Sequence, residues 1–275
     1  MTFGSLFAGI GGFDLGLERS GMTCKWQVEI DDYATKVLAK HWPHVKRYRD
    51  VREVGAHNLE PVDLICGGFP CQDLSCAGDQ AGIQEGTRSG LWLQYARIIR
   101  ELRPQWVLAE NVPGLLSANA GRDMGRILGD LAACGLDVEW QCIPASAFGA
   151  PHLRERVWIL AYTQHAGLAW RRRVAVAGKK GHELRGILHT LPSGMYGQTE
   201  AMVSNAYNSR RIQQARREQN GRRRLGDCAW WETEPAVERV AYGVPNGVDR
   251  DRCLGNAVVP QVAEWIGRRI MEASQ

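Results

Sequence analysis

The sequence predicts an α/β fold, in which helices cover both faces of a parallel sheet. The main observation is that strand-like and helix-like stretches alternate along residues 1–162. A second is the glycine-rich turn at residues 8–12, which separates the first predicted strand from the first predicted helix. Strands that alternate with helices are joined by right-handed crossovers, so we expect all of these strands to share one parallel sheet.

Each predicted element has a local signal in the sequence. Short apolar stretches predict strands at residues 2–7, 24–29, 62–66, 106–109, 138–143 and 156–161. Apolar residues at helical spacing predict helices at residues 13–20, 91–102 and 124–131, a helix capped by Asp31 or Asp32, and a last helix at residues 259–271. Pro260 fits this last helix because proline is tolerated in the first helical turn.

The charge of the chain is unevenly distributed. Residues 171–224 hold 13 Lys and Arg against three Glu, a net charge of +10, whereas the remainder holds 21 basic and 27 acidic residues, a net charge of −6. The alternation of strand-like and helix-like patterns stops over residues 163–229. We therefore divide the chain into an α/β domain at residues 1–162, a basic region at 163–229 and a C-terminal segment at 230–275 that returns to the first domain. The basic region indicates a polyanionic partner, most often nucleic acid, although a solvated loop would have the same composition.

Composition excludes several classes of protein. Apolar residues make up 44% and charged residues 23% of the 275-residue chain, as in globular proteins. No apolar run is long enough for a membrane helix, and the first residues lack the basic start of a secretory signal, so we expect a cytoplasmic protein that does not bind membranes. The eight cysteines form no C-x-x-C pair, and the spacing of Cys66, Cys71 and Cys76 is not typical of zinc. We expect free thiols and no metal site.

The glycine turn and Glu29 form the first candidate site. Such a turn lets the backbone approach a ligand and directs helix N–H groups at it. Glu29 ends the second predicted strand, where an acid binds ribose hydroxyls in nucleotide-binding α/β folds. The spacing Gly9-x-Gly11-Gly12 differs from G-x-G-x-x-G and disfavours a dinucleotide. A nucleoside-containing cofactor and a purely structural turn both stay open.

Cys71 and Glu110 form the second candidate site. Cys71 follows one buried strand in the loop at residues 67–72, and Glu110 ends the next strand along the chain. Because catalytic groups lie beyond the carboxyl ends of such strands, we expect both at one edge of the sheet. A nucleophilic cysteine beside a carboxylic acid suggests covalent catalysis with proton assistance. The alternatives are a buried inert cysteine and an acid that is ion-paired or caps a helix.

Taken together, these segments resemble the DNA (cytosine-5)-methyltransferase family, especially its short bacterial and phage-type members. The matching motifs, in the family's order, are residues 7–13, Glu29-Ile30, Asp50-Val51, Pro70-Cys71-Gln72, Arg88-Ser89-Gly90-Leu91, Glu110-Asn111-Val112, Arg154-Glu155-Arg156 and residues 255–260. The match covers about residues 1–162 and 234–270. The resemblance implies a Rossmann-like class I methyltransferase sheet with a catalytic and cofactor-binding domain at 1–162, and it makes residues 163–229 the target recognition region.

The resemblance also implies a reaction. A methyl group would pass from S-adenosylmethionine, which leaves as S-adenosylhomocysteine, to C5 of a cytosine in a specific double-stranded DNA sequence. Cys71 would bond to C6 of the flipped base, Glu110 would hold a proton at N3, and Arg154 and Arg156 would contact the cytosine O2 and nearby backbone. The implied cofactor-binding residues are Phe7, Gly9, Ile10, Gly11, Gly12, Glu29, Ile30, Asp50, Val51, Pro70, Leu91, Asn256 and Ala257. The implied substrate-binding residues are Gln72, Asn111, Val112, Arg222 and Arg223.

Two positions depart from the family pattern. Ser5 stands where the first strand usually carries an acid, and His152 stands where the paired-arginine motif usually begins with Gln. Neither departure touches Cys71 or Glu110.

Three other functions compete with DNA methylation. A nicotinamide oxidoreductase explains the glycine turn alone. A tRNA cytosine-5 methyltransferase shares the nucleophile and acid motifs, but its Cys-Phe-Thr signature is absent. A catalytically idle DNA-binding relative disagrees with the intact Cys71 and Glu110. We expect a monomer that acts on DNA in a bacterial cytoplasm or a phage-infected cell, with a cognate restriction endonuclease as a further partner.

Overall fold

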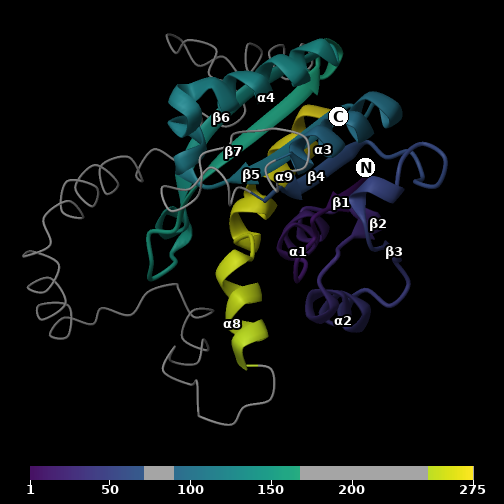
Figure 1. The fold of residues 1–275 in the computed structure, drawn as a ribbon, viewed down its shortest axis with the longest axis vertical. Helices are drawn as coiled ribbons and strands as arrows, with labels where there is room; N and C mark the ends of the chain where they lie inside the picture. The colour runs from purple at the N-terminus through teal and green to yellow at the C-terminus, as the bar shows by residue number, and fades with distance from the viewer. Residues whose placement is uncertain (71–89, 168–246, 275) are drawn as a thin grey trace, which may run out of the picture.

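The computed structural model describes residues 1–70, 90–167 and 247–274, and these parts form a seven-stranded sheet with helices on both faces (Figure 1). The strand order is β3-β2-β1-β4-β5-β7-β6. The strands are β1 Thr2–Leu6, β2 Thr23–Val28, β3 Lys46–Tyr48, β4 Leu64–Gly68, β5 Trp106–Asn111, β6 Leu136–Pro144 and β7 Glu155–Thr163. The predicted α/β class is confirmed.

Helices connect the strands and cover the sheet. They are α1 Gly12–Arg19, α2 Asp32–His41, α3 Leu91–Leu102, α4 Arg122–Ala133, α8 Gly247–Asn256 and α9 Pro260–Ser274, with short 3-10 turns at η1 Val51–Glu53, η3 Pro113–Leu116, η4 Ala118–Gly121 and η5 Ala145–Phe148. Asp31 caps α2, since its side chain accepts a hydrogen bond from the Ala34 N–H at 2.9 Å. The sequence did not predict β3 or α8. No helix in the described ranges is both long and apolar enough to cross a bilayer.

The direction of β7 corrects the sequence-based prediction. Strands β1 to β5 are parallel, but β7 runs antiparallel to both of its neighbours, β5 and β6. The prediction of a wholly parallel sheet is therefore wrong at this edge. The reason is the connection, because only η5 and a short loop separate β6 from β7, and a parallel return needs a longer crossover.

Both faces of the sheet are buried. On one face, side chains of α3 and α4 such as Trp92 and Ile127 pack against Leu6 and Ile65 of the strands. On the other face, α1 and α9 pack against residues that include Trp158. Alternate residues of a strand point to opposite faces, so strands that are covered on both sides need apolar residues throughout. This requirement explains the continuous apolar stretches in the sequence.

The described C-terminal residues 247–274 pack against the N-terminal part of the domain. Helices α1 and α9 lie side by side (Figure 1). A Cβ atom at Gly12 would be 2.3 Å from the Val258 carbonyl oxygen, and one at Gly16 would be 2.4 Å from the Pro260 carbonyl oxygen. These two glycines therefore let the backbone of residues 258–260 approach α1 closely.

The strand order places a binding edge between β1 and β4. From β1 the chain proceeds outward to β2 and β3, and from β4 it proceeds in the opposite direction to β5. Ligands of open α/β sheets bind beyond the carboxyl ends of the strands at such a switch point. The predicted site residues follow these same strand ends.

Candidate functional site

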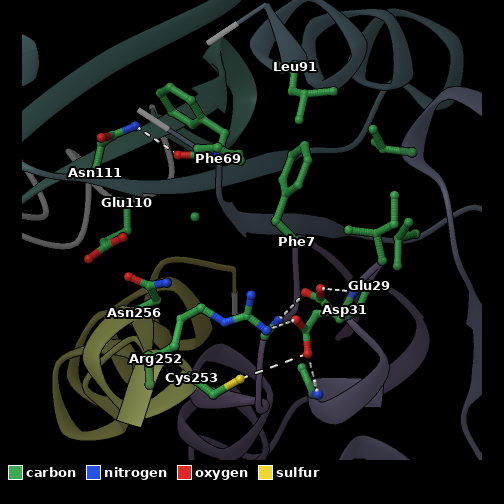
Figure 2. A pocket seen from close by; sticks show the side chains of 18 of the residues that line it. Phe7, Glu29, Asp31, Phe69, Leu91, Glu110, Asn111, Arg252, Cys253 and Asn256 are labelled. Atoms are coloured by element: carbon green, nitrogen blue, oxygen red, sulfur yellow. Dashed lines mark hydrogen bonds and ion pairs between the residues drawn. The ribbon is translucent and has the colours of Figure 1, made fainter. Parts of the chain in front are cut away.

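A cavity of about 560 Å³ lies at the carboxyl ends of β1, β2, β4 and β5. Its volume is in the range of small-molecule and cofactor sites. Of the residues predicted from the sequence, those that line it are Phe7, Gly9, Glu29, Ile30, Asp50, Val51, Pro70, Leu91, Glu110, Asn111, Val112, Arg156, Asn256 and Ala257. The close view shows side chains from both halves of the sheet and from α8 around this space (Figure 2). The fold thus brings segments that are distant in sequence to one site.

Glu29 ties the glycine turn to the end of β2. The Gly9 N–H donates to Glu29 Oε2 at 2.7 Å, and the Asp31 N–H donates to Glu29 Oε1 at 2.8 Å. Gly9 has a left-handed φ of 55°, and a Cβ atom built on it would meet nothing within 4 Å. The turn is therefore open toward the cavity, and its backbone is accessible to a ligand.

The other residues of the glycine motif have different surroundings. Gly11 caps α1 with a φ of 89°, and a Cβ atom there would be 2.4 Å from the Trp42 ring. Gly12 packs on Val258, and Ile10 lines a separate groove between α2 and α8. These three residues do not line the cavity. Gly11 and Gly12 are required by backbone conformation and helix packing.

Asp50 and Val51 form the wall beside Glu29. Asp50 caps η1, where its carboxylate accepts from the Arg52 N–H at 2.9 Å and pairs with the Arg52 guanidinium at 2.6 Å. The hydrogen bonds from the Arg52 side chain hold the pKa of Asp50 below its usual value. The Asp50 side chain is therefore a carboxylate at neutral pH.

Glu110 lies at the opposite end of the cavity and is almost fully buried, at 7% exposure. Burial raises the pKa of its carboxyl to about 7, and the positive charges of Arg156 and Arg154 oppose this rise. Arg156 Nε lies 3.1 Å from Glu110 Oε1. A Cβ atom at Gly68, the residue opposite on β4, would be only 3.1 Å from Glu110 Oε2, so glycine leaves room for the carboxyl group.

Asn111 fixes the backbone that leads toward Cys71. Its Nδ2 donates to the Phe69 carbonyl at 3.1 Å, and its Oδ1 accepts from the Val112 N–H at 2.8 Å. The amide thereby joins the end of β5 to the segment that follows β4. Pro70 is the last residue described before Cys71. Cys71 and Gln72 themselves lie outside the described residues, as do Arg222 and Arg223.

The two predicted arginines, Arg154 and Arg156, have different contacts. Arg156 lines the cavity and pairs with Glu110. Arg154 does not line it. Its guanidinium donates to the Gly255 carbonyl at 2.7 Å and to the Ala257 carbonyl at 2.6 Å, on either side of Asn256. His152 is exposed and also lies away from the cavity wall.

Several lining residues were missed by the sequence analysis. These are chiefly Asp31, Arg49, Arg52, Arg252 and Cys253. Arg252 lies four residues before Asn256, about one helical turn, and a helix at this position would have indicated that both share a face. The polar sequence of α8 gave no such helix signal.

The departure at Ser5 has a structural counterpart. The Ser5 hydroxyl donates to Asp14 Oδ2 at 3.1 Å, and Gln27 Nε2 donates to Asp14 Oδ1 at 2.8 Å. Asp14 is completely buried, which raises its pKa to about 6. The carboxyl group beside β1 therefore comes from Asp14 of α1. In the family pattern described above, the acid stands at the position of Ser5 on the strand itself.

Comparisons with known proteins identify the family of the chain. Residues 1–230 match the family described as C-5 cytosine-specific DNA methylase. The Type II methyltransferase M2.BsuMI of Bacillus subtilis (strain 168) is 42% identical over 161 residues, covering 57% of this chain and 41% of that protein. M.NgoFVII of Neisseria gonorrhoeae, also a Type II methyltransferase, is 34% identical over 169 residues, covering 61% of this chain and 45% of that protein.

A solved structure also resembles this chain. A prophage-encoded E. coli protein assigned as a DNA modification methyltransferase superposes with a TM-score of 0.52 and 29% identity, covering 60% of this chain and 47% of that one. The matched part of this chain thus spans less than half the length of each of these three relatives. The family match extends over most of the sequence, including the segments that form the cavity from Phe7 to Arg156. The chain belongs to the C-5 cytosine-specific DNA methylase family, whose members are S-adenosylmethionine-dependent methyltransferases.

Proposed function

We propose that this chain transfers a methyl group from S-adenosylmethionine to C5 of a cytosine in a specific double-stranded DNA sequence. The observation that carries the proposal is that one cavity joins the Gly9–Glu29 turn to the Glu110–Arg156 pair. The turn and its acid suit a nucleoside-containing cofactor. A buried carboxyl whose pKa is near neutral suits proton exchange with a base.

The residues around the first half of the cavity fit the cofactor. Gly9 leaves its backbone open to the space, and the Glu29 and Asp50 carboxylates offer acceptors for hydroxyl and amino groups. Ile30 is 62% exposed at the cavity wall, so a large apolar side chain is available for a ring. When bound, S-adenosylmethionine supplies an electrophilic methyl group. Phe7, Leu91, Asn256 and Ala257 would complete its surroundings.

Cys71 would activate the target carbon. Attack of its thiolate on C6 of cytosine forms an S–C6 bond and opens the C5=C6 double bond, which makes C5 nucleophilic. C5 then takes the methyl group. Loss of the C5 proton to solvent and expulsion of the thiolate restore the aromatic ring. Cysteine suits both steps, because a thiolate is a strong nucleophile and a good leaving group. Pro70, the residue before Cys71 in the sequence, lines the cavity, which supports this role.

Glu110 would keep negative charge from building up on the ring. With a pKa of about 7, a large fraction of the carboxyl groups are protonated at neutral pH. A protonated carboxyl can donate to N3 while C6 is attacked. Arg156 holds the carboxyl in place and is available to the cytosine O2. Arg154 would act indirectly, because its hydrogen bonds hold residues 255–257 in place.

The DNA would have to present its cytosine outside the helix. Base flipping costs roughly a few kcal/mol, and contacts from a basic region to phosphates can offset it. The basic region at residues 171–224 is the candidate for these contacts, including Arg222 and Arg223. We expect the chain to act as a monomer on DNA in the cytoplasm. The Type II names of its relatives support a cognate restriction endonuclease as partner.

A covalent trap tests the reaction. The target sequence is first identified by bisulfite sequencing of DNA from cells that express the chain. A duplex with 5-fluorocytosine at that position is then incubated with the protein and S-adenosylmethionine. Fluorine cannot leave C5 as a cation, so a protein–DNA adduct should accumulate and survive a denaturing gel. Cys71→Ala should form none, whereas the matched control Cys76→Ala should form it normally.

Three outcomes would contradict parts of the proposal. Equal adduct yield from Cys71→Ala would assign the attack to another cysteine. Absence of any adduct on DNA that the wild-type protein methylates would exclude the covalent route. Methylation of tRNA but not of DNA would establish the tRNA cytosine-5 methyltransferase activity instead.

A further inference from the structure

One wall of the cavity comes from the end of α8, far from the other walls in sequence. Arg252, Cys253, Asn256 and Ala257 line the space from this side. Figure 2 shows Arg252 extending from α8 toward Asp31, with Asn256 on the same helix nearer Glu110. The segment at residues 252–257 therefore reaches along the cavity from the Glu29 end to the Glu110 end.

At the Glu29 end this segment is joined to α2 by an ion pair. Arg252 Nη2 lies 2.5 Å from Asp31 Oδ2, and it also approaches Asp249 at 3.4 Å. Asp31 Oδ1 accepts from the Ala34 N–H and caps α2. The Asp31 N–H donates to Glu29, whose other oxygen accepts from Gly9. Arg252 is thus the last member of a chain of polar contacts that begins at the glycine turn.

At the Glu110 end the same segment is joined to Arg154, the residue before β7. Arg154 donates to the carbonyls of Gly255 and Ala257, which flank Asn256. Arg154 has a φ of 30°, an uncommon conformation for a residue other than glycine. The wall is therefore attached at both ends, and the Arg252 ion pair lies at the end beside the proposed cofactor site, where Cys253 Sγ also lies 4.0 Å from Asp31 Oδ1.

We propose that Arg252 is a positioning residue of the cofactor site, whose ion pair with Asp31 closes the cavity at the Glu29 end and slows exchange of the bound S-adenosyl group. This inference depends on the proposed function, because it requires that the cavity hold S-adenosylmethionine. Arg252 acts through Asp31 on the position of α8. Neither residue needs to contact the cofactor.

The expected effect is moderate, because the pair is partly solvated. The side chains of Arg252 and Asp31 are 55% and 27% exposed. Loss of an ion pair of this kind should accelerate dissociation of the cofactor about two- to fivefold. Salt should also weaken the wild-type pair, since exposed charges are screened.

Dissociation of S-adenosylhomocysteine, measured by stopped-flow displacement, tests this role without methyl transfer. The variants are Arg252→Gln, Asp31→Asn and the double variant. Asn at position 31 keeps the cap of α2 while removing the charge. Each single variant should release the ligand about two- to fivefold faster, and the double variant no faster than either. Arg252→Lys should restore part of the slow release. Arg250→Gln, an exposed arginine on the same helix, is the matched control and should release the ligand at the wild-type rate.

The steady-state kinetics give a second readout. On unmethylated DNA that carries the target sequence, the KM for S-adenosylmethionine should rise in Arg252→Gln while kcat is unchanged or higher, and the Tm of the ligand-free protein should stay the same. Unchanged release from Arg252→Gln would overturn the proposal. Faster release from Arg252→Gln together with normal release from Asp31→Asn would also overturn it, by showing that Arg252 contacts the ligand directly. If the wild-type protein does not bind S-adenosylhomocysteine at all, the proposed function itself fails.

Discussion

The Glu110 carboxyl should make the folded protein less stable as the pH rises. Its pKa is about 7 in the folded protein against a usual value of 4.5. Between these two values the folded carboxyl still holds its proton while the unfolded one has lost it. The contribution to stability is therefore full below pH 4.5 and is lost as the pH rises through 7. A shift of this size corresponds to about 3 kcal/mol in total, of which about 2 kcal/mol falls between pH 5 and pH 8.

Glu110→Gln isolates this effect. Gln has nearly the same shape and keeps an oxygen for Arg156, but it does not titrate. The free energy of unfolding of wild type, minus that of the variant, should fall by about 2 kcal/mol from pH 5 to pH 8. Urea denaturation followed by tryptophan fluorescence at both pH values gives this difference. Glu155→Gln, at an exposed position on the neighbouring strand, is the matched control for the substitution itself. Parallel pH profiles for wild type and Glu110→Gln would refute the assignment of a raised pKa to this carboxyl.

The same variant connects stability with chemistry. If protonated Glu110 assists attack at C6, adduct formation by Glu110→Gln should be slower by about 10²–10⁴. The wild-type rate should decline as the pH rises above 7, because the carboxyl loses its proton. At lower pH it should decline because Cys71 loses its thiolate. Wild-type adduct rates in the variant would show that the buried carboxyl stabilises the site without moving a proton.

Other residues give separate predictions. Asp14→Asn removes a buried carboxyl whose pKa is raised to about 6, so the free energy of unfolding of the variant minus that of wild type should rise by about 2 kcal/mol from pH 4 to pH 8, as measured by urea denaturation. Gly12→Ala would bring a methyl group against the Val258 carbonyl and should destabilise the fold by about 1–3 kcal/mol, which a lower Tm would reveal. Replacing Arg222, Arg223 and Arg224 with Gln should reduce the salt dependence of DNA binding, by about 0.9 in log–log slope for each phosphate that these side chains neutralise. An unchanged slope would place this cluster outside the DNA interface.

The sequence predicted most of the sheet because buried strands need continuous apolar residues. It did not predict the antiparallel direction of β7, since a buried strand carries the same pattern in either direction. The strand β3 has only three residues, too few to form a pattern. Helix α8 was missed for a different reason, because it is polar along most of its length and its position depends on contacts such as Arg252 with Asp31.

The site was predicted in outline, and the roles of individual residues were not. Glu29, Asp50 and Glu110 line the cavity as their places at strand ends indicate. Gly11 was expected at the cofactor, but its left-handed backbone and the nearby Trp42 ring account for it. The sequence does not distinguish a glycine that faces a ligand from one that packs against a helix. Only the surroundings of its missing Cβ atom distinguish the two.

The connectivity of the chain separates the basic region from the strands that build the cavity. Strand β7 ends at Thr163, and the next described element, α8, begins at Gly247. The basic region lies in the sequence between them, outside the order of strands that builds the cavity. Its length and composition can therefore change without altering β1, β4 or β5. The cavity still depends on the C-terminal segment, because Asn256, Ala257 and Arg252 reach it only after the chain has returned.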